Sequence, residues 1–414
     1  MKNWAGNVAY SSNDLRLPGS VSELQDVVAG ARRVRAVGTR HSFSTVVDTA
    51  GVLVSTAGLG LPIEVDDAGG VAWVPGATTY ADLAPVLQEA GWALHNMGSL
   101  PHISVAGACS TGTHGSGAGN GCLASRIVGV ELVTGTGELV TGLAGQPDFP
   151  GMVLALGSLG VVTRLAVALE PTYDVRQEVV LDVPVRSAVD RAAEILGSAY
   201  SVSMFLAFRD SATVDSVWLK HREGASTSPD HGWGGRPAAE AVHPIIGIDA
   251  GAATDQLGSS GPWHERLPHF RPSFTPSVGD EIQSELFVPL DRASEVLAAV
   301  VDRSAELAPA VQVMEIRAIA ADDLWLSPFR GRDTLAVHAT WVSDLAVVRP
   351  ALEVLQDAVA PFEPRPHWGK YFLGFDRHWV ESTYPGVAAF RDLGSRLDPE
   401  RRFVNDYVEQ RGIR

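Results

Sequence analysis

The stretch Val34-Arg35-Ala36-Val37-Gly38-Thr39-Arg40-His41-Ser42-Phe43 decides how this chain is expected to fold. Its apolar beginning, Val34 to Val37, predicts a strand, and Gly38 predicts a tight turn directly after that strand. The turn presents a single histidine, His41. Because a strand followed by a glycine turn exposes backbone amides, the arrangement suits a phosphate-bearing cofactor. The stretch therefore predicts a cofactor loop with His41 beside the cofactor, although an ordinary strand-loop-strand connection fits the local spacing equally well.

The composition is that of a large globular enzyme. The chain has 414 residues, 45% of them hydrophobic and 19% charged, which is enough for two or three domains with sizeable cores. The net charge of −16 and the lack of a basic run argue against nucleic acid or an anionic membrane as a partner. No stretch approaches about 18 apolar residues and the first residues form no apolar leader, so we expect a cytoplasmic protein. We expect a monomer, because no coiled-coil or edge-strand feature predicts association.

Neither the cysteines nor the histidines predict a metal site. Cys109 and Cys122 have no CxxC or zinc-ligand spacing, so buried free thiols are expected. His264 and His269 lie near each other, but the prolines around them break the helix that their spacing would need to bind one ion.

Short strands and helices alternate through the first 170 residues. Helices are predicted at 21–31 and from Thr79 to Gly91, where Thr79-Tyr80-Ala81-Asp82 is a capping-box variant. Strands are predicted at 34–37, 52–55, 63–65, 71–74, 127–134, 139–141 and 161–169. A hairpin turn is expected at 66–70, and Pro171 is the predicted domain boundary.

The segment 96–117 is rich in small residues. It is too apolar at its centre for a linker, and it holds too many glycines for a long helix. Small side chains let a backbone approach a ligand closely, and the amides at a helix start can bind a pyrophosphate. The segment is therefore expected to form a second wall of the cofactor site.

The pattern after residue 171 predicts an α+β region with an antiparallel sheet. Strands are predicted at 175–183, 203–208, 214–220, 282–288, 311–319 and 334–342, and helices at about 186–196, 291–307 and 346–360. Residues 223–276 are rich in proline and glycine and are predicted to be mostly irregular. A loop of that length is usually functional.

Three of these strands carry polar residues at alternate positions, which share one face of a strand. The pairs are Gln283 and Glu285, Glu315 and Arg317, and His338 and Thr340. Such a face fits either the solvated side of an antiparallel sheet or a binding site. The amide, imidazole and guanidinium groups, framed by Val313 and Ile319, favour a site, because buried charges must pair or bind a ligand.

Lys370 lies in the aromatic segment His367-Trp368-Gly369-Lys370-Tyr371-Phe372. A lysine between aromatic residues is easily removed from water, which lowers its pKa and makes it a candidate proton acceptor. The alternative is a surface lysine whose aliphatic stem covers its apolar neighbours.

Four motifs of the first half are Gly38-Thr39-Arg40-His41-Ser42, Ser104-Val105-Ala106-Gly107, Gly112-Thr113-His114-Gly115 and Gly160-Val161-Val162-Thr163. They resemble the flavin-binding half of the vanillyl-alcohol-oxidase-type FAD oxidoreductases. In the second half, Gln283-Ser284-Glu285, Glu315-Ile316-Arg317 and His367-Trp368-Gly369-Lys370, with the segments 96–104 and 261–276, resemble the bacterial alditol oxidases. The likeness covers nearly the whole chain, and the second-half motifs are the more specific.

This resemblance implies an α+β, two-domain PCMH-type flavoprotein, in which a FAD-binding domain of two α/β subdomains carries a cap domain with an antiparallel sheet flanked by helices. The implied divisions are 1–171, 172–371 and a C-terminal segment, 372–414, that returns to the FAD-binding domain. FAD would be bound covalently through His41. The other implied FAD-binding residues are Gly38, Thr39, Arg40, Ser42, Phe43, Ser99, Ser104, Gly107, Ala108, Cys109, Ser110, Thr111, His114 and Val162. Many members have glycine at the position of Arg40.

The resemblance also implies oxidation of a terminal hydroxyl of an alditol, such as xylitol or sorbitol, with dioxygen as the second substrate. The implied catalytic residues are Arg317, Lys370, His338 and Glu315, and the implied substrate-binding residues are Ser99, Gln283 and Thr340. Gly98 matches a position where a small residue lets dioxygen reach the flavin. Either His338 or Lys370 could accept the hydroxyl proton. The rival functions are a sugar-1,4-lactone oxidase of the same superfamily and a flavin-binding protein without catalysis.

Overall fold

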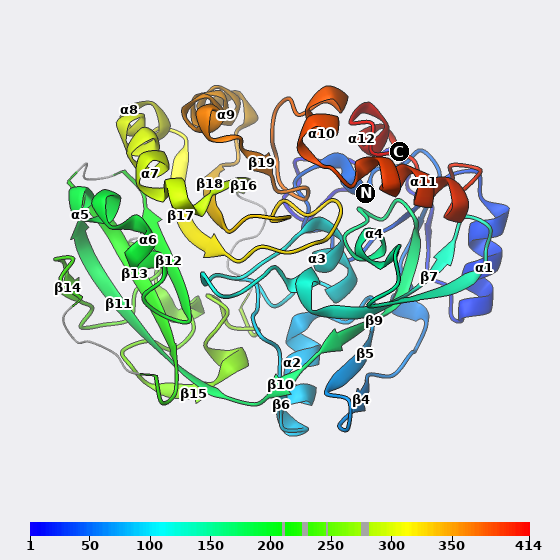
Figure 1. The fold of residues 1–414 in the computed structure, drawn as a ribbon, viewed down its shortest axis with the longest axis horizontal. Coiled ribbons are helices and arrows are strands. Elements are labelled where there is room, and N and C mark those ends of the chain that lie inside the picture. The colour runs from blue at the N-terminus through cyan, green and yellow to red at the C-terminus, as the bar shows by residue number, and fades with distance from the viewer. Residues whose placement is uncertain (209–211, 226–230, 246, 275–280) are drawn as a thin grey trace.

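The structure is a computed structural model that describes residues 1–208, 212–225, 231–245, 247–274 and 281–414. Figure 1 shows two halves side by side, one formed by the N-terminal segments with the C-terminal helices, the other by a large sheet with helices on its outer side. Both chain termini lie in the first half (Figure 1). Among the described residues, no helix combines the length and the apolar character needed to cross a membrane.

Two sheets form the core of the N-terminal half. A parallel sheet has the order β1 (Leu15–Arg16), β3 (Val52–Val54) and β2 (Val34–Ala36), and an antiparallel sheet has the order β4 (Glu64–Asp66), β5 (Val71–Pro75), β9 (Gly160–Ala168), β7 (Ile127–Thr134) and β8 (Leu139–Leu143). The predicted hairpin at 66–70 is confirmed, because β4 pairs with β5 across it. β6 (Trp92–Ala93) and β10 (Glu170–Pro171) form a separate short pair.

Helices pack on these sheets through apolar stripes. α1 (Val21–Gly30) begins after Ser20, whose side chain accepts from the amide of Glu23, and it buries Leu24 and Val28. α2 (Tyr80–Glu89) is capped by Thr79, which accepts from the amide of Asp82, as the capping-box pattern predicts. α3 (Val105–Thr111) is the short helix within the segment 96–117, and it ends at Gly112 with φ of 82°. A residue with a Cβ would be strained at that position.

The second half is built on one large, mostly antiparallel sheet. Its order is β14 (Arg236–Pro237), β11 (Asp174–Pro184), β13 (Thr213–Arg222), β12 (Ser201–Leu206), β17 (Val311–Ile319), β18 (Thr334–Val342), β16 (Glu281–Pro289) and β19 (Arg365–Pro366), and β15 (Ser260–Pro262) also pairs with β11. The predicted antiparallel α+β architecture is thus confirmed, and β14 and β15 lie within the segment that was predicted to be mostly irregular.

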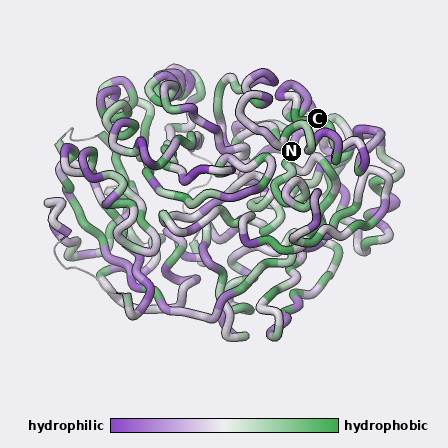
Figure 2. Tube along the Cα trace, viewed as in Figure 1, coloured by the Kyte–Doolittle hydropathy of each residue, from purple (hydrophilic) through white to green (hydrophobic). Residues whose placement is uncertain are grey.

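One face of this sheet is covered by the helices α5 (Val185–Asp190), α6 (Ala192–Leu196), α7 (Ala293–Asp302), α8 (Ser304–Leu307) and α9 (Leu345–Val359). The strand faces opposite the polar pairs are apolar, and their residues, including Ile316, Val337 and Trp341, are buried against these helices. In Figure 2 these helices carry both hydrophobic and hydrophilic residues, as helices with one buried face do. The predicted helix 186–196 is broken at Arg191, where φ is −121° and the guanidinium donates to the carbonyl of Gly232.

The C-terminal segment returns to the N-terminal half through α10 (Arg377–Thr383), α11 (Val387–Leu397) and α12 (Asp406–Gln410). Buried Arg35 of β2 fixes this return, because its guanidinium donates to the carbonyls of Phe403 at 2.9 Å, Gly157 at 2.9 Å and Leu156 at 2.6 Å. The sheet membership of the chain changes between β10 and β11, next to Pro171. The three-part domain division remains a prediction.

Candidate active site

A cavity of about 640 Å³ lies between the two halves and is lined by residues of both. Its walls are the loop that follows β2, the segment 98–114 and the face of the large sheet that the helices leave open. The predicted site residues that line it are Gly38, Thr39, Arg40, His41, Ser42, Phe43, Gly98, Ser99, Ser104, Gly107, Ala108, Ser110, Thr111, His114, Val162, Gln283, Glu315, Arg317, His338, Thr340 and Lys370. A volume of this size is typical of a cofactor or ligand site.

The loop after β2 holds His41 in a fixed, neutral form. Its Nδ1 lies 3.0 Å from Oγ1 of Thr39, and its ring stacks on Trp4 with the centroids 5.2 Å apart. Burial lowers the pKa of His41 to about 4, and the charges of His102 and Lys370 add to the effect. Arg40 has φ of 64°, the left-handed conformation that favours glycine. A glycine at this position of the loop, as the resemblance implies for many family members, would therefore be free of backbone strain.

Small residues in the loop after β2 and in α3 leave the backbone exposed along this side of the cavity. A Cβ on Gly38 would come within 2.5 Å of Oγ of Ser104, and a Cβ on Gly107 would come within 2.8 Å of the same atom. At either position an added Cβ would force the Ser104 hydroxyl to move. Gly38 thus lets the loop approach the start of α3, while Gly107 leaves room for the same hydroxyl within α3. An extended cavity with backbone walls on one side and a polar sheet on the other suits a flavin dinucleotide, whose phosphates need close backbone approach.

Cross-strand register brings the polar strand faces together. Glu285 of β16 pairs with His338 of β18, and His338 pairs with Glu315 of β17, so the three side chains form one row across three strands. The next row contains Gln283 and Thr340. All these groups lie in the cavity wall rather than in bulk solvent. The polar face therefore lines a cavity, and the alternative of a solvated sheet face is wrong.

Arg317 lies between two buried carboxylates. Its Nη2 is 2.5 Å from Oε1 of Glu285, and its Nε is 3.5 Å from Oε1 of Glu315. Burial raises the pKa of both carboxyl groups, but Arg317 and a neighbouring histidine outweigh it and hold both pKa values below their usual range. The two carboxylates thus stay ionised. Within the described residues, Nε of Arg317 makes no hydrogen bond, which leaves a donor beside the cavity.

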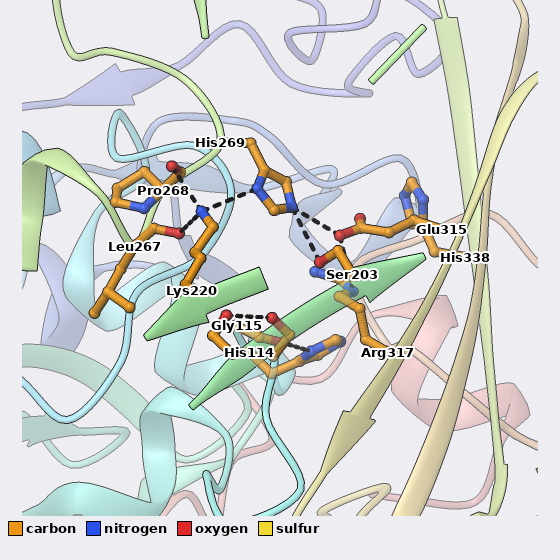
Figure 3. A network of polar contacts seen from close by, with 12 residues as sticks. His114, Gly115, Ser203, Lys220, Leu267, Pro268, His269, Glu315, Arg317 and His338 are labelled. Atoms are coloured by element: carbon orange, nitrogen blue, oxygen red, sulfur yellow. Dashed lines mark hydrogen bonds and ion pairs between the residues drawn. The ribbon is translucent and has the colours of Figure 1, made fainter. Parts of the chain in front are cut away.

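A histidine contacts each carboxylate, at the same oxygen that Arg317 contacts. Nε2 of His114 lies 3.1 Å from Oε1 of Glu285, while its Nδ1 lies 2.7 Å from the carbonyl of Gly115. Nε2 of His269 lies 2.8 Å from Oε1 of Glu315. Figure 3 shows His269 meeting Glu315 of β17, with Arg317 of the same strand and His338 of β18 next to them.

Gln283 connects His338 with Lys370. Its Oε1 accepts from Nζ of Lys370 and lies 3.3 Å from Nε2 of His338. Since an amide oxygen only accepts, His338 carries its proton on Nε2. Burial lowers the pKa of His338 to about 3, with Lys370 and Arg317 adding to the effect and Glu285 opposing it. His338 is therefore neutral, and its Nδ1 has no hydrogen-bond partner among the described residues.

Lys370 is held at the cavity wall rather than at the surface. Its ammonium lies 5.3 Å from the centre of the Phe43 ring, and burial lowers its pKa. Phe43 is in turn fixed by its amide, which donates to the carbonyl of Gly369 at 2.7 Å. The cofactor loop and the substrate side of the cavity thus meet at this contact.

Cys109 is the one predicted site residue that does not line the cavity. Its Sγ lies 3.7 Å from the hydroxyl of Tyr80 in the apolar core, and burial raises its pKa to about 12. α3 turns this side chain inward while Ser110 and Thr111 face the cavity. Cys109 and Cys122 are both buried free thiols, as expected.

Several site residues were not assigned a role from the sequence. Glu285 was noted only as a polar strand position, and its role as a partner of Arg317 needs the register. His269 was considered only as a metal ligand, and it instead binds Glu315. Other lining residues, His243, Phe270, Glu281, Gln312 and His367, come from the long loop and from strand ends. His243 and Phe270 lie in the long segment 223–276, and His367 lies in the motif that contains Lys370, but the sequence carried no residue-level signal for any of the five.

Comparisons with known proteins agree with this geometry. The family model of a FAD binding domain matches residues 15–142, and that of D-arabinono-1,4-lactone oxidase matches residues 280–411. An alditol oxidase from Streptomyces sp. (strain IKD472 / FERM P-14339) is 43% identical over 98% of this chain and 97% of its own length. An L-gulono-1,4-lactone dehydrogenase from Mycobacterium tuberculosis (strain ATCC 25618 / H37Rv) is 29% identical over 99% of this chain and 98% of its own length.

Solved structures share the fold at low sequence identity. Cholesterol oxidase from B. sterolicum superposes with a TM-score of 0.79 at 11% identity, over 99% of this chain and 96% of its own. A solvent-stable cholesterol oxidase gives a TM-score of 0.81 at 14% identity, over 100% and 97% of the two chains. Identities this low support the fold alone. The full-length 43% identity and the FAD-binding match show that the chain belongs to the alditol oxidase family of vanillyl-alcohol-oxidase-type FAD oxidoreductases.

Proposed function

We propose that this enzyme oxidises the terminal primary hydroxyl of alditols, such as xylitol and sorbitol, to the aldose, with dioxygen reduced to hydrogen peroxide. The observation that carries this proposal is the set of buried donors and acceptors on one sheet face around Arg317. An alditol offers a hydroxyl on every carbon, and each buried polar group left unpaired costs about 1–3 kcal/mol. A site for such a molecule therefore needs many converging polar groups.

Substrate binding would divide between neutral and charged groups. Ser99, Gln283 and Thr340 offer hydroxyl and amide groups that both donate and accept. Glu315 accepts from hydroxyls. Arg317 and Lys370 would donate to the oxygen of the hydroxyl group whose carbon is oxidised. Nε of Arg317 makes no hydrogen bond to the described protein groups, and its 3.5 Å contact with Glu315 is an ion pair only.

Proton removal is assigned to His338. Its neutral imidazole has a lone pair on Nδ1, and the row that it shares with Glu285 and Glu315 favours a positive charge on the ring once the proton arrives. The cations of Arg317 and Lys370 would stabilise the alkoxide that forms. When bound, FAD supplies the two-electron chemistry, taking a hydride from the alcohol carbon and passing both electrons to dioxygen.

His41 is proposed as the covalent attachment point of FAD. Its place in the cavity and its low pKa support this role, because a neutral ring nitrogen keeps the lone pair that a new bond needs. If the attachment is covalent, acid precipitation leaves the yellow colour in the protein pellet. For His41→Ala, the colour is expected in the supernatant. Flavin that leaves the wild-type pellet would contradict the attachment.

Gly98 is proposed to keep the path of dioxygen open, because it lines the cavity without a side chain. We also propose that the protein is monomeric and cytoplasmic, that it binds neither nucleic acid nor a membrane, and that it uses no metal. The two buried free thiols support a reducing compartment. Size-exclusion chromatography with light scattering tests the monomer.

Peroxide release from a panel of alditols and lactones tests the substrate assignment. We expect turnover with xylitol and sorbitol and little or none with sugar-1,4-lactones. A lactone oxidase is the rival to exclude, because the lactone oxidase family model matches residues 280–411. Turnover of a lactone that exceeds turnover of every alditol would overturn the proposal.

A further inference from the structure

Lys220 of β13 is a buried lysine that lies behind the cavity wall and that the reaction does not use directly. Its Nζ lies 2.8, 2.6 and 3.1 Å from the carbonyl oxygens of Arg266, Leu267 and Pro268. A fourth contact, of 3.3 Å, reaches Nδ1 of His269. Figure 3 shows Lys220 below the turn formed by Leu267 and Pro268, with its ammonium directed to His269.

This arrangement decides which nitrogen of His269 carries the proton. Three carbonyl oxygens around one nitrogen suit an ammonium, which has three hydrogens, better than an amine, which has two. An ammonium has no lone pair, so Nδ1 of His269 can only accept, through a hydrogen that it shares with the carbonyl of Pro268, the most distant of the three. The proton of the neutral imidazole is then on Nε2, which lies 2.8 Å from Oε1 of Glu315.

The ring of His269 has little freedom to leave this position. Phe205 and Trp218 present ring edges to it, with centroid distances of 5.5 and 5.3 Å. The amide of His269 donates to the carbonyl of Ser99 at 3.2 Å, and the amide of Thr254 donates to the carbonyl of His269 at 2.9 Å. The segment that carries the ring is thus fixed on both sides.

Glu315 receives both of its side-chain contacts on one oxygen. Oε1 meets Nε2 of His269 and, at 3.5 Å, Nε of Arg317. In the described part of the chain, no hydrogen bond or ion pair reaches Oε2. A carboxylate held in this way has one oxygen fixed by protein and one available to a substrate hydroxyl.

We propose that His269 is a positioning residue for alditol binding: Lys220 holds it as the Nε2–H tautomer, and it orients Glu315 so that the second carboxylate oxygen meets a substrate hydroxyl. This inference rests on the proposed alditol oxidase function. It predicts that kcat/KM for the alditol depends on a hydrogen-bond donor at the position of Nε2. The imidazole ring itself is not required, provided that another side chain supplies this donor.

Two variants separate these properties. In His269→Gln, the side-chain amide nitrogen can replace Nε2–H as donor to Glu315, whereas in His269→Asn the shorter side chain reaches only toward Lys220. For His269→Asn we expect kcat/KM for xylitol to fall about 10- to 100-fold, the size of one lost hydrogen bond to a charged group. His269→Gln should restore it to within a few-fold of wild type. Flavin content and thermal midpoint are measured for both, because a merely structural role would lower these as well.

Equal kcat/KM in the two variants overturns the positioning role, provided that wild type turns over xylitol. Failure of wild type to oxidise any alditol instead refutes the proposed function, so the two failures are distinct. The tautomer is tested directly on wild type by nitrogen NMR with labelled histidine. The resonance missing in His269→Gln identifies His269. Because burial lowers the pKa of Lys220 to about 7, spectra are recorded near pH 6, where its ammonium prevails. An Nε2–H pattern supports the proposal, and an Nδ1–H or doubly protonated pattern overturns it.

Discussion

Arg317 and Glu285 form a buried ion pair with an Nη2–Oε1 distance of 2.5 Å, although β18 lies between the strands that carry them. The residue of β18 paired with Arg317 is Ala336, whose methyl group leaves room for the guanidinium to reach across the strand. His338 pairs with Glu285 in the adjacent row. One small side chain in the middle strand thus allows a charge cluster to form over three strands.

Loss of the Glu285 charge should destabilise the fold strongly. Glu285→Gln removes the closer of the two carboxylates that Arg317 contacts and leaves its buried guanidinium with only the 3.5 Å contact to Glu315. Removing one member of a buried pair costs about 3–5 kcal/mol. Urea denaturation of the FAD-loaded protein measures the change. Glu295→Gln is the matched control, because Glu295 pairs with Arg292 on the exposed surface, where ion pairs contribute little. Equal stability of the two variants would show that the cluster is not held by this charge.

The pH dependence of flavin reduction should reveal Lys370 as a cation and not as the base. Its ammonium is present below its pKa and is lost as the pH rises through that value, which burial lowers from the ordinary 10.5. His338, with a pKa of about 3, is already neutral. The rate constant for reduction by xylitol should therefore be level near neutral pH and fall at alkaline pH. Lys370→Arg should remove this alkaline fall. A wild-type rate that rises with pH would instead assign the base to Lys370.

Arg40 should be replaceable by glycine with a gain in stability. Its φ of 64° costs about 1–2 kcal/mol for a residue with a Cβ. Glycine removes this strain, but its greater freedom in the unfolded state offsets part of the gain. Arg40→Gly is therefore expected to raise the free energy of unfolding by up to about 1 kcal/mol. Arg32→Gly, on the exposed connection just before β2, is the control and should lower it. A loss of stability in Arg40→Gly would mean that the arginine side chain stabilises the loop.

Gly98 should control reoxidation by dioxygen and not reduction by substrate. A Cβ at this position would meet Thr113 and Ile103 at 3.6 and 3.7 Å, which are ordinary contacts, so a side chain can be accommodated. In Gly98→Val the added methyl groups should slow reoxidation by about tenfold or more, which corresponds to about 1.4 kcal/mol on the barrier. Stopped-flow mixing with oxygenated buffer measures this step. Gly98→Ala is the smaller change, and its reoxidation rate constant should lie between those of wild type and Gly98→Val. Unchanged reoxidation in both variants would place the oxygen path elsewhere.

The sequence predicted the strands and the polar strand faces, because alternation along one strand is a local property. It could not predict which polar residues meet, since the register that aligns Glu285, His338 and Glu315 depends on three strands far apart in the chain. Cys109 was misplaced because α3 consists of small residues, so its buried stripe of Val105, Ala108 and Cys109 differs too little from the opposite face to be recognised in the sequence.

Lys220 and His269 show why part of the site is not visible in a sequence. Lys220 lies in an otherwise ordinary strand, and its carbonyl partners are 46 to 48 residues later in the chain. A turn that offers three carbonyl oxygens leaves no mark in the residue types, because every residue has a carbonyl. The sequence could suggest only that the long segment 223–276 was functional.

Anaerobic mixing of the enzyme with xylitol tests the central claim most directly, because it requires substrate binding, proton removal and hydride transfer but no dioxygen. The account predicts that xylitol bleaches the flavin absorbance of wild type. It also predicts that Arg317→Ala, still loaded with flavin, is bleached about 100-fold or more slowly, since it lacks the cation that stabilises the alkoxide. Flavin that stays oxidised in wild type with every alditol, or bleaching of Arg317→Ala at the wild-type rate, would contradict the account.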